Sequence, residues 1–108
     1  MQGQGNVHHV ACLLREQITA SGLSCEQVGE TRRQIEGISV YVMVFEKYYM
    51  RASNRASLTV VVSGDEQEVC VDAIGSGGGQ GAIFRFSWGA EDSFVGTVED
   101  ILRRNGFR

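Results

Sequence analysis

The sequence contains no proline among its 108 residues, although an average chain of this length holds about five. Long apolar runs are also missing: the longest, residues 40–45, is far shorter than the roughly 20 residues of a membrane-spanning helix. With 43% hydrophobic residues, the chain is too apolar for a disordered tail, and it is neither collagen nor a proline-rich linker. We therefore expect one globular domain over residues 1–108, with residues 1–6 disordered or left over from an expression vector.

Positive charge is scarce as well. Ten basic residues against 13 acidic ones give a net charge of −3, so electrostatics does not favour nucleic acid or an anionic membrane as a partner. The start of the chain lacks the basic segment and apolar core of a secretory signal. Cys12, Cys25 and Cys70 are odd in number and lack metal-type spacing, so we expect reduced thiols in the cytoplasm and neither a metal nor a cofactor.

Periodic apolar residues and turn-forming glycines predict the order of the elements. Helical spacing occurs near both ends of the chain, and alternation predicts five strands between them. The helices are expected at 7–20 and 90–105, and the strands at 24–36, 38–51, 58–62, 68–74 and 82–88. Asn6 is expected to cap the first helix, and Gly22 and Gly106 to end the two helices. Turns are expected at Glu36-Gly37 and at residues 52–56. This α-β-β-β-β-β-α order with short links predicts an α+β two-layer sandwich, in which an antiparallel sheet of about five strands carries both helices on one face.

The strand at 38–51 is apolar on both of its faces. Its even-numbered residues from Val40 to Val44 and its odd-numbered residues from Tyr41 to Phe45 are all apolar. A sheet that faces water on one side should instead show one polar face. We therefore predict a non-enzymatic module that forms a homo-oligomer, a homodimer being the simplest, or binds a protein partner through its sheet.

A second cluster of interest is the glycine-rich segment 75–81, which holds five of the 14 glycines. Gly77, Gly79 and Ala82 fit a loose G-x-G-x-x-A spacing, but a nucleotide-binding fingerprint requires a helix directly afterwards. Here a strand-like segment follows. Two readings stay open: a flexible connection between strands, or a loop that closes over a ligand or a partner.

The end of the strand at 38–51, together with the glycine-rich segment, supplies an alternative function, an anionic small-molecule binding domain or an enzyme. Lys47, Tyr49 and Arg51 alternate onto one face, where charge and cation–π contact can hold a ligand. The candidate ligand-binding residues are Lys47, Tyr49, Arg51, Arg55, Gly77, Gly78, Gly79 and Gln80. Two simpler interpretations compete: long side chains at a strand end reach water, and Arg55 anchors the turn or pairs with an acid.

No catalytic residue is predicted. Cys70 lacks a base, because His8 and His9 lie near the start of the chain, and it is expected to be a small buried hydrophobe. The two histidines are adjacent, so on a helix their side chains point about 100° apart and do not form a metal-binding face.

Four motifs in the second half of the chain follow one another in a specific order. They are FEKYY-x-R at 45–51, NRA at 54–56, the glycine-rich segment with its QG, and F-x-F-x-WG at 84–89. Together, residues 45–102 resemble a small uncharacterised bacterial family, a domain of unknown function. The first 36 residues match it only as a helix followed by a strand. The resemblance implies a compact α+β domain and implies no activity.

Overall fold

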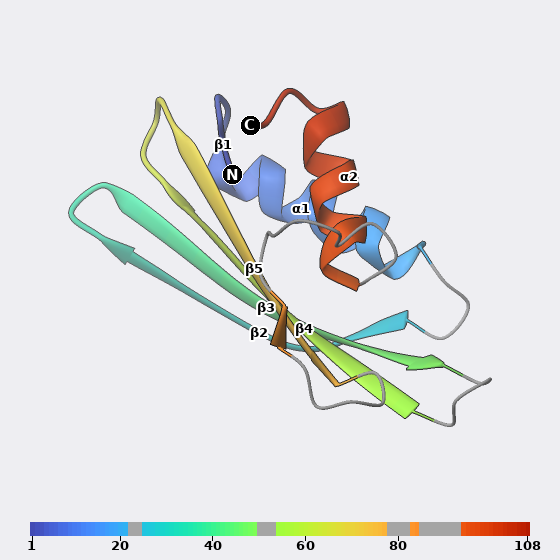
Figure 1. The fold of residues 1–108 in the computed structure, drawn as a ribbon. Helices are drawn as coiled ribbons and strands as arrows, with labels where there is room; N and C mark the ends of the chain where they lie inside the picture. The colour runs from blue at the N-terminus through green and yellow to red at the C-terminus, as the bar shows by residue number, and fades with distance from the viewer. Residues whose placement is uncertain (22–24, 50–53, 78–82, 85–93) are drawn as a thin grey trace.

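The computed structural model describes residues 1–21, 25–49, 54–77, 83–84 and 94–108, which form a sheet layer and a helix layer (Figure 1). In chain order the elements are β1 (Gln2–Gly3), α1 (Val7–Thr19), β2 (Cys25–Ile35), β3 (Ile38–Tyr49), β4 (Asn54–Gly64), β5 (Val69–Gly77), β6 (Ile83–Phe84) and α2 (Phe94–Arg104). The predicted α+β class is confirmed. None of the described helices is both long and apolar enough to cross a membrane.

Every strand pairing in the sheet is antiparallel. The order across the sheet is β1-β5-β4-β3-β2, and β6 also pairs with β5. The long strands β2 to β5 follow one another in the chain and pair in sequence order, as expected for a series of hairpins. The two-residue strands β1 and β6 pair with opposite ends of the same edge of β5, at Cys70 and Gly75 respectively.

Several predicted boundaries differ from the structure because strand pairing extends beyond the alternating apolar residues. Residues 52–56 were expected to form a turn, but β4 begins at Asn54, which lies opposite Tyr49 of β3. β5 runs on to Gly77, inside the glycine-rich segment. Residues 1–6, for which we expected disorder, include β1. Backbone hydrogen bonds to a neighbouring strand override the weak local preferences at these positions.

Both helices begin or end where their sequences indicate. Asn6 caps α1, since its side-chain oxygen accepts a hydrogen bond from the His9 backbone N–H at 3.2 Å. Gly106, with φ of 85°, follows α2 in the left-handed conformation that ends many helices. The predicted cap and stop are thus confirmed. The predicted first turn of the second helix, at 90–93, and Gly22 lie outside the described residues.

The hydrophobic core lies between the helices and one face of β3, β4 and β5. Tyr41, Met43 and Phe45 lie opposite Val62, Val60 and Leu58, so their side chains share that face. The buried core residues are Val7, Val10, Ala11, Leu14, Ile18, Tyr41, Met43, Phe45, Ala56, Leu58, Val60, Val62, Val69, Val71, Ala73, Val95, Val98, Ile101, Leu102 and Phe107. All residues of β2 stay at least partly exposed, so the core ends at β3.

The turn between β2 and β3 is a tight hairpin formed by Glu36 and Gly37. Their φ angles are 48° and 85°, and Ile35 lies directly opposite Ile38. Two successive positive φ values are the signature of the two-residue turn whose twist suits paired strands. The turn predicted at these two residues is confirmed.

The two ends of the described chain are paired with each other. Gln2 and Arg108 exchange two backbone hydrogen bonds, N–H to carbonyl oxygen, of 2.7 and 2.8 Å. Met1 and Val71 exchange a further two, of 2.8 and 2.7 Å. The ends therefore lie side by side next to β5, where the N and C marks appear together (Figure 1).

Candidate functional site

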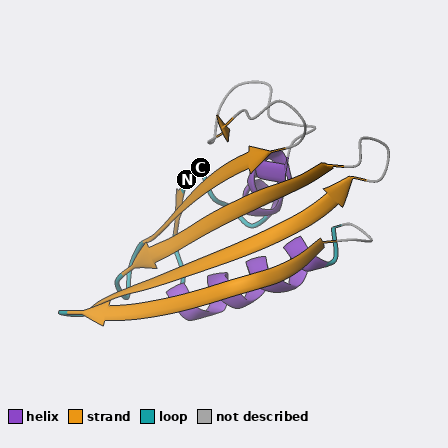
Figure 2. Ribbon diagram, turned by 90° about the horizontal axis from the view of Figure 1, so that it is seen from below, coloured by secondary structure: helices purple, strands orange, loops and turns teal. Residues whose placement is uncertain are grey.

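The sheet face opposite the helices is termed here the helix-free face. Figure 2 looks onto this face, with the strands in front of both helices. It consists of the alternate residues of β2 to β5 that do not enter the core. These are Glu26, Gly29, Thr31, Arg33, Ile35, Ile38, Val40, Val42, Val44, Glu46, Tyr48, Arg55, Ser57, Thr59, Val61, Ser63, Cys70, Asp72 and Ile74.

The centre of the helix-free face is apolar. Val42 of β3 lies opposite Val61 of β4, and Val40 and Val44 flank Val42 along its strand. All four valines are only partly exposed, because neighbouring side chains in the sheet shield them, yet no described helix packs on them. An antiparallel sheet that meets water usually carries polar residues at such positions. The predicted two-sided apolar character of β3 is therefore extended by one residue of β4, Val61, whereas the other β4 residues of this face are polar.

Charged side chains stand at the two margins of this face. Arg33 of β2 lies opposite Val40, whereas Asp72 of β5 lies opposite Val61, which itself lies opposite Val42. The two charges therefore stand at opposite edges of the face and are offset by two residues along the strand direction. Both side chains are exposed. Among the described residues, neither takes part in an ion pair. The face therefore has an apolar middle, with Arg33 at the β2 edge and Asp72 at the β5 edge, while Glu26 lies further along the β2 edge.

An ion pair closes the end of the face near the β3–β4 connection. Arg55 Nη1 lies 3.5 Å from Glu46 Oε1, and both side chains are well exposed to water. The expectation that Arg55 pairs with an acid is confirmed. Such an exposed pair contributes at most about 1 kcal/mol, so its main effect is to neutralise Glu46, which lies opposite Glu26.

The residues predicted to bind an anionic ligand are only partly described. Lys47 lies opposite Cys25 and Ala56 and points to the helix side of the sheet, whereas Arg55 points to the helix-free face. Gly77 lies opposite Ala56, two strands from Lys47, which corresponds to about 10 Å at the usual strand spacing. The backbone of Tyr49 pairs with Asn54. Arg51, Gly78, Gly79 and Gln80 lie outside the described residues, so this site stays a prediction.

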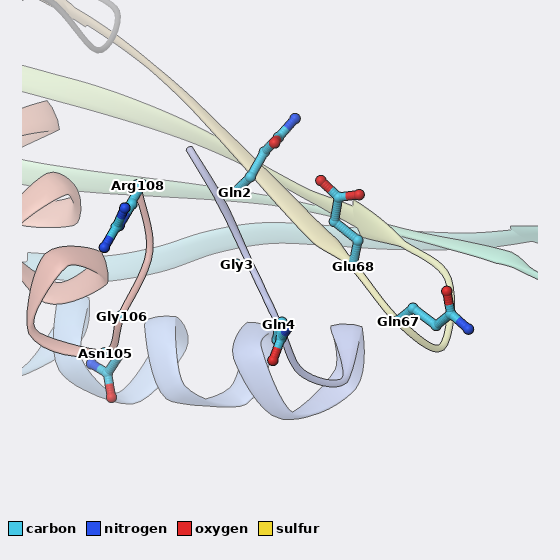
Figure 3. A pocket seen from close by; sticks show the side chains of 8 residues that line it. All are labelled: Gln2, Gly3, Gln4, Gln67, Glu68, Asn105, Gly106 and Arg108. Carbon is cyan, nitrogen blue, oxygen red and sulfur yellow. The ribbon is translucent and has the colours of Figure 1, made fainter.

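A shallow depression of about 690 Å³ lies between β1, the β4–β5 turn and the C-terminal segment (Figure 3). It is lined by Gln2, Gly3, Gln4, Gln67, Glu68, Asn105, Gly106 and Arg108. Figure 3 shows that its side chains diverge: Gln2 and Glu68 extend to one side, Arg108 and Asn105 to the other, and Gln67 points away from the turn. A binding site needs polar groups that converge on one point, and this depression does not supply them.

Sequence reasoning identified the apolar character of β3 but not the whole face. The alternation of Ser57, Thr59, Val61 and Ser63 was the available signal for the contribution of β4. The relation between Arg33 and Asp72 depends on register across four strands, and a single sequence does not carry that information.

The fold and this face define a small two-layer α+β protein whose described helices both pack on one face of its antiparallel sheet. Residues 1–106 match the model of a family of unknown function, DUF6054, and the chain belongs to this family. The resemblance predicted from residues 45–102 is thereby confirmed and extends over nearly the whole chain. Comparison with curated proteins and with solved structures gave no match.

Proposed function

We propose that this protein is a non-enzymatic module that forms a homodimer through the helix-free face. The observation that carries the proposal is the group of partly exposed valines at its centre: Val40, Val42, Val44 and Val61. Removing apolar surface from water stabilises an assembly by about 25 cal/mol per Å². A second copy presents the same apolar centre, so the face is complementary to itself. The proposal places the dimer in the cytoplasm, in line with three free thiols.

The size of the face supports this assembly. It spans four strands of nine to twelve residues. At the usual strand spacing and rise, such a surface covers about 650 Å² per copy, or about 1,300 Å² for two copies. Stable protein interfaces bury about 1,200–2,000 Å² in total, so two facing sheets reach this range.

The marginal charges support one particular arrangement. A two-fold axis parallel to the strands places β2 of one copy over β5 of the other, in the aligned packing common to two-sheet structures. Arg33 then approaches Asp72 of the second copy, and symmetry makes this contact twice. The offset of two residues along the strand is about 7 Å, which the long arginine side chain can span.

The other simple axis is less favourable. An axis across the strands stacks β5 on β5, so Asp72 meets only Cys70, Asp72 or Ile74 of the second copy. A carboxylate buried against an apolar side chain or a second carboxylate loses hydration without gaining an opposite charge. The proposal therefore commits to the axis that joins Arg33 to Asp72.

The test is size-exclusion chromatography with light scattering over a concentration series. We expect the mass to rise from 11.8 kDa towards twice that value. Arg33→Asp and Asp72→Arg should each weaken the dimer by about tenfold or more, because like charges then face each other twice, and the double variant should restore it. Glu66→Arg, a charge reversal in the exposed β4–β5 turn, is the matched control and should change nothing.

Two outcomes would contradict the proposal. A wild-type protein that remains monomeric at high micromolar concentration overturns self-association. A dimer that both single variants weaken and the double variant fails to restore overturns the axis. Circular dichroism of each variant separates these results from a loss of folding.

A further inference from the structure

Three side chains with polar or reactive ends lie along one face of α1, because they are spaced by four and three residues: His8, Cys12 and Arg15. The Cys12 sulfur is 3.7 Å from His8 Nε2 and 3.7 Å from Arg15 Nη1. Cys12 is partly exposed and His8 is exposed. A thiol that solvent can reach therefore has an imidazole and a guanidinium as direct neighbours.

The imidazole of His8 is held from its other side by Tyr41. His8 Nδ1 lies 2.7 Å from Tyr41 Oη, and the two rings are tilted by 54° with centroids 5.9 Å apart. Tyr41 is only 6% exposed and belongs to β3, so its hydroxyl is a rigid anchor. When Nδ1 carries the proton and donates a hydrogen bond to Tyr41 Oη, the unprotonated Nε2 faces Cys12 as an acceptor. In this tautomer His8 is placed to take the thiol proton.

Arg15 is held in place by β2. Its Nε and Nη2 both donate to Glu30 Oε1, at 3.0 and 2.6 Å, and Gln27 donates to the same oxygen at 2.9 Å. The remaining terminal nitrogen, Nη1, is thereby directed at Cys12. A fixed positive charge at this position attracts anionic groups on an incoming molecule.

The cluster borders a depression on its Arg15 side, which Cys12 itself does not line. This depression of about 370 Å³ is lined by Arg15 and residues 27–30. Cys25 lies in a different environment, since its thiol is partly buried, and this burial raises the pKa of the thiol. Cys70 lies on the helix-free face, and in the described part of the chain no histidine contact to it is found.

We propose that Cys12 is a reactive-thiol site for small disulfides that carry carboxylate groups. His8 Nε2 takes the thiol proton, and the Cys12 thiolate attacks one sulfur of the small disulfide. The original S–S bond breaks as the mixed disulfide forms, and the proton on His8 passes to the leaving thiolate or, where that thiolate is weakly basic, to water. The Cys12 sulfur is oxidised while the leaving sulfur is reduced, so the small disulfide is the only oxidant. Arg15 pairs with the carboxylate of the incoming group.

Limiting amounts of 5,5′-dithiobis(2-nitrobenzoate), whose two halves each carry a carboxylate, test the site in the full chain. Absorbance of the released thiolate gives the rate, and peptide mass spectrometry assigns the modified cysteine. We expect Cys12 to react first, and His8→Ala to slow it by at least about tenfold at neutral pH. His9→Ala, at the next position of the same helix, is the matched control and should leave the rate unchanged. His8→Gln replaces His8→Ala if the latter unfolds, as judged by circular dichroism.

A second comparison separates charge recognition from general reactivity. Cystamine, a disulfide with amine ends, should react more slowly with Cys12 than the carboxylate reagent, relative to their rates with a free small thiol. Arg15→Gln should remove this preference. Equal effects of His8→Ala and His9→Ala, or preferential labelling of Cys25 or Cys70, would overturn the site. A preference that survives Arg15→Gln would overturn the role assigned to Arg15.

Discussion

Glu30 shows how single side chains shape the electrostatics of this protein. Its carboxylate accepts hydrogen bonds from Gln27 and from two nitrogens of Arg15. The hydrogen bond from Gln27, followed by the hydrogen bonding and charge of Arg15, lowers the pKa of Glu30, while partial desolvation opposes the shift. The same contact raises the pKa of Arg15. Both directions agree that the charged pair is favoured in the folded state.

The stability of the protein should therefore depend on pH through Glu30. Because the folded-state pKa lies below the unfolded one, the stabilisation is present above the unfolded pKa, about 4.3, and is lost as the pH falls through the folded pKa. Glu30→Gln should lower the free energy of unfolding by no more than about 1 kcal/mol at neutral pH, since the pair is about one-third exposed. It should also make the free energy of unfolding depend less on pH in the acid range. Urea unfolding from pH 7 down to pH 3 measures both effects. Glu16→Gln, on the exposed side of α1, is the control. If Glu30→Gln keeps the same pH dependence of the free energy of unfolding as this control, the role assigned to Glu30 is ruled out.

Chemistry at single residues was the part that the sequence predicted least. The spacing of His8, Cys12 and Arg15 along a helix was visible, but the partners that organise them, Tyr41 and Glu30, come from two different strands. The histidines were set aside because of their position near the start of the chain. The packing of α1 on β2 and β3 shows that His8 contacts both Tyr41 and Cys12.

At the scale of elements, the sequence was far more informative. The hairpin at Glu36-Gly37, the helix cap at Asn6 and the stop at Gly106 follow from local backbone and capping chemistry, and all three are confirmed. Strand lengths were predicted less well. The residues from Asn54 to Ala56 look like a turn by composition, yet pairing with the end of β3 draws them into the sheet.

The hairpin between β2 and β3 can be tested by one pair of glycine substitutions. Gly37 has φ of 85°, and a Cβ there would contact nothing, so Gly37→Ala should cost about 1–2 kcal/mol purely from the left-handed backbone. Gly29→Ala in β2 also meets open space, and its φ lies outside the left-handed region, so it should be neutral or slightly stabilising. Thermal unfolding of both variants gives the comparison. Equal costs at the two positions would contradict the backbone explanation.

For the whole molecule, the two-layer arrangement was predictable, because two amphipathic helices and a series of hairpins have few other ways to bury their apolar faces. The open sheet face was anticipated from β3 alone. Register across the four strands was not, and neither was β1. A two-residue strand has no periodicity to detect, and its pairing with β5 joins residues 66 and 68 positions apart.

We expect the paired chain ends to open as a unit separate from the hairpins. The contacts of Met1 and Gln2 with Val71 and Arg108 close the longest loops in the fold, so chain entropy makes them the last to form on folding. For the same reason they are the first to open in the native state. Hydrogen exchange should then show the Gln2 and Arg108 amides exchanging through a local opening that leaves β3 and β4 protected.

Gly3→Ala should increase the difference in hydrogen-exchange rate between the chain ends and the strands β3 and β4. A Cβ on Gly3 would lie 2.9 Å from the ring of Phe107, and such overpacking costs about 1–3 kcal/mol. Exchange at Gln2 and Arg108 should accelerate while the centre of the sheet stays unchanged, and Gly29→Ala serves as the control. Uniform acceleration across all strands would mean that the molecule unfolds as a single unit. If the paired chain ends instead open on their own, the edge of β5 at Val69 and Cys70 becomes free while the rest of the protein stays folded.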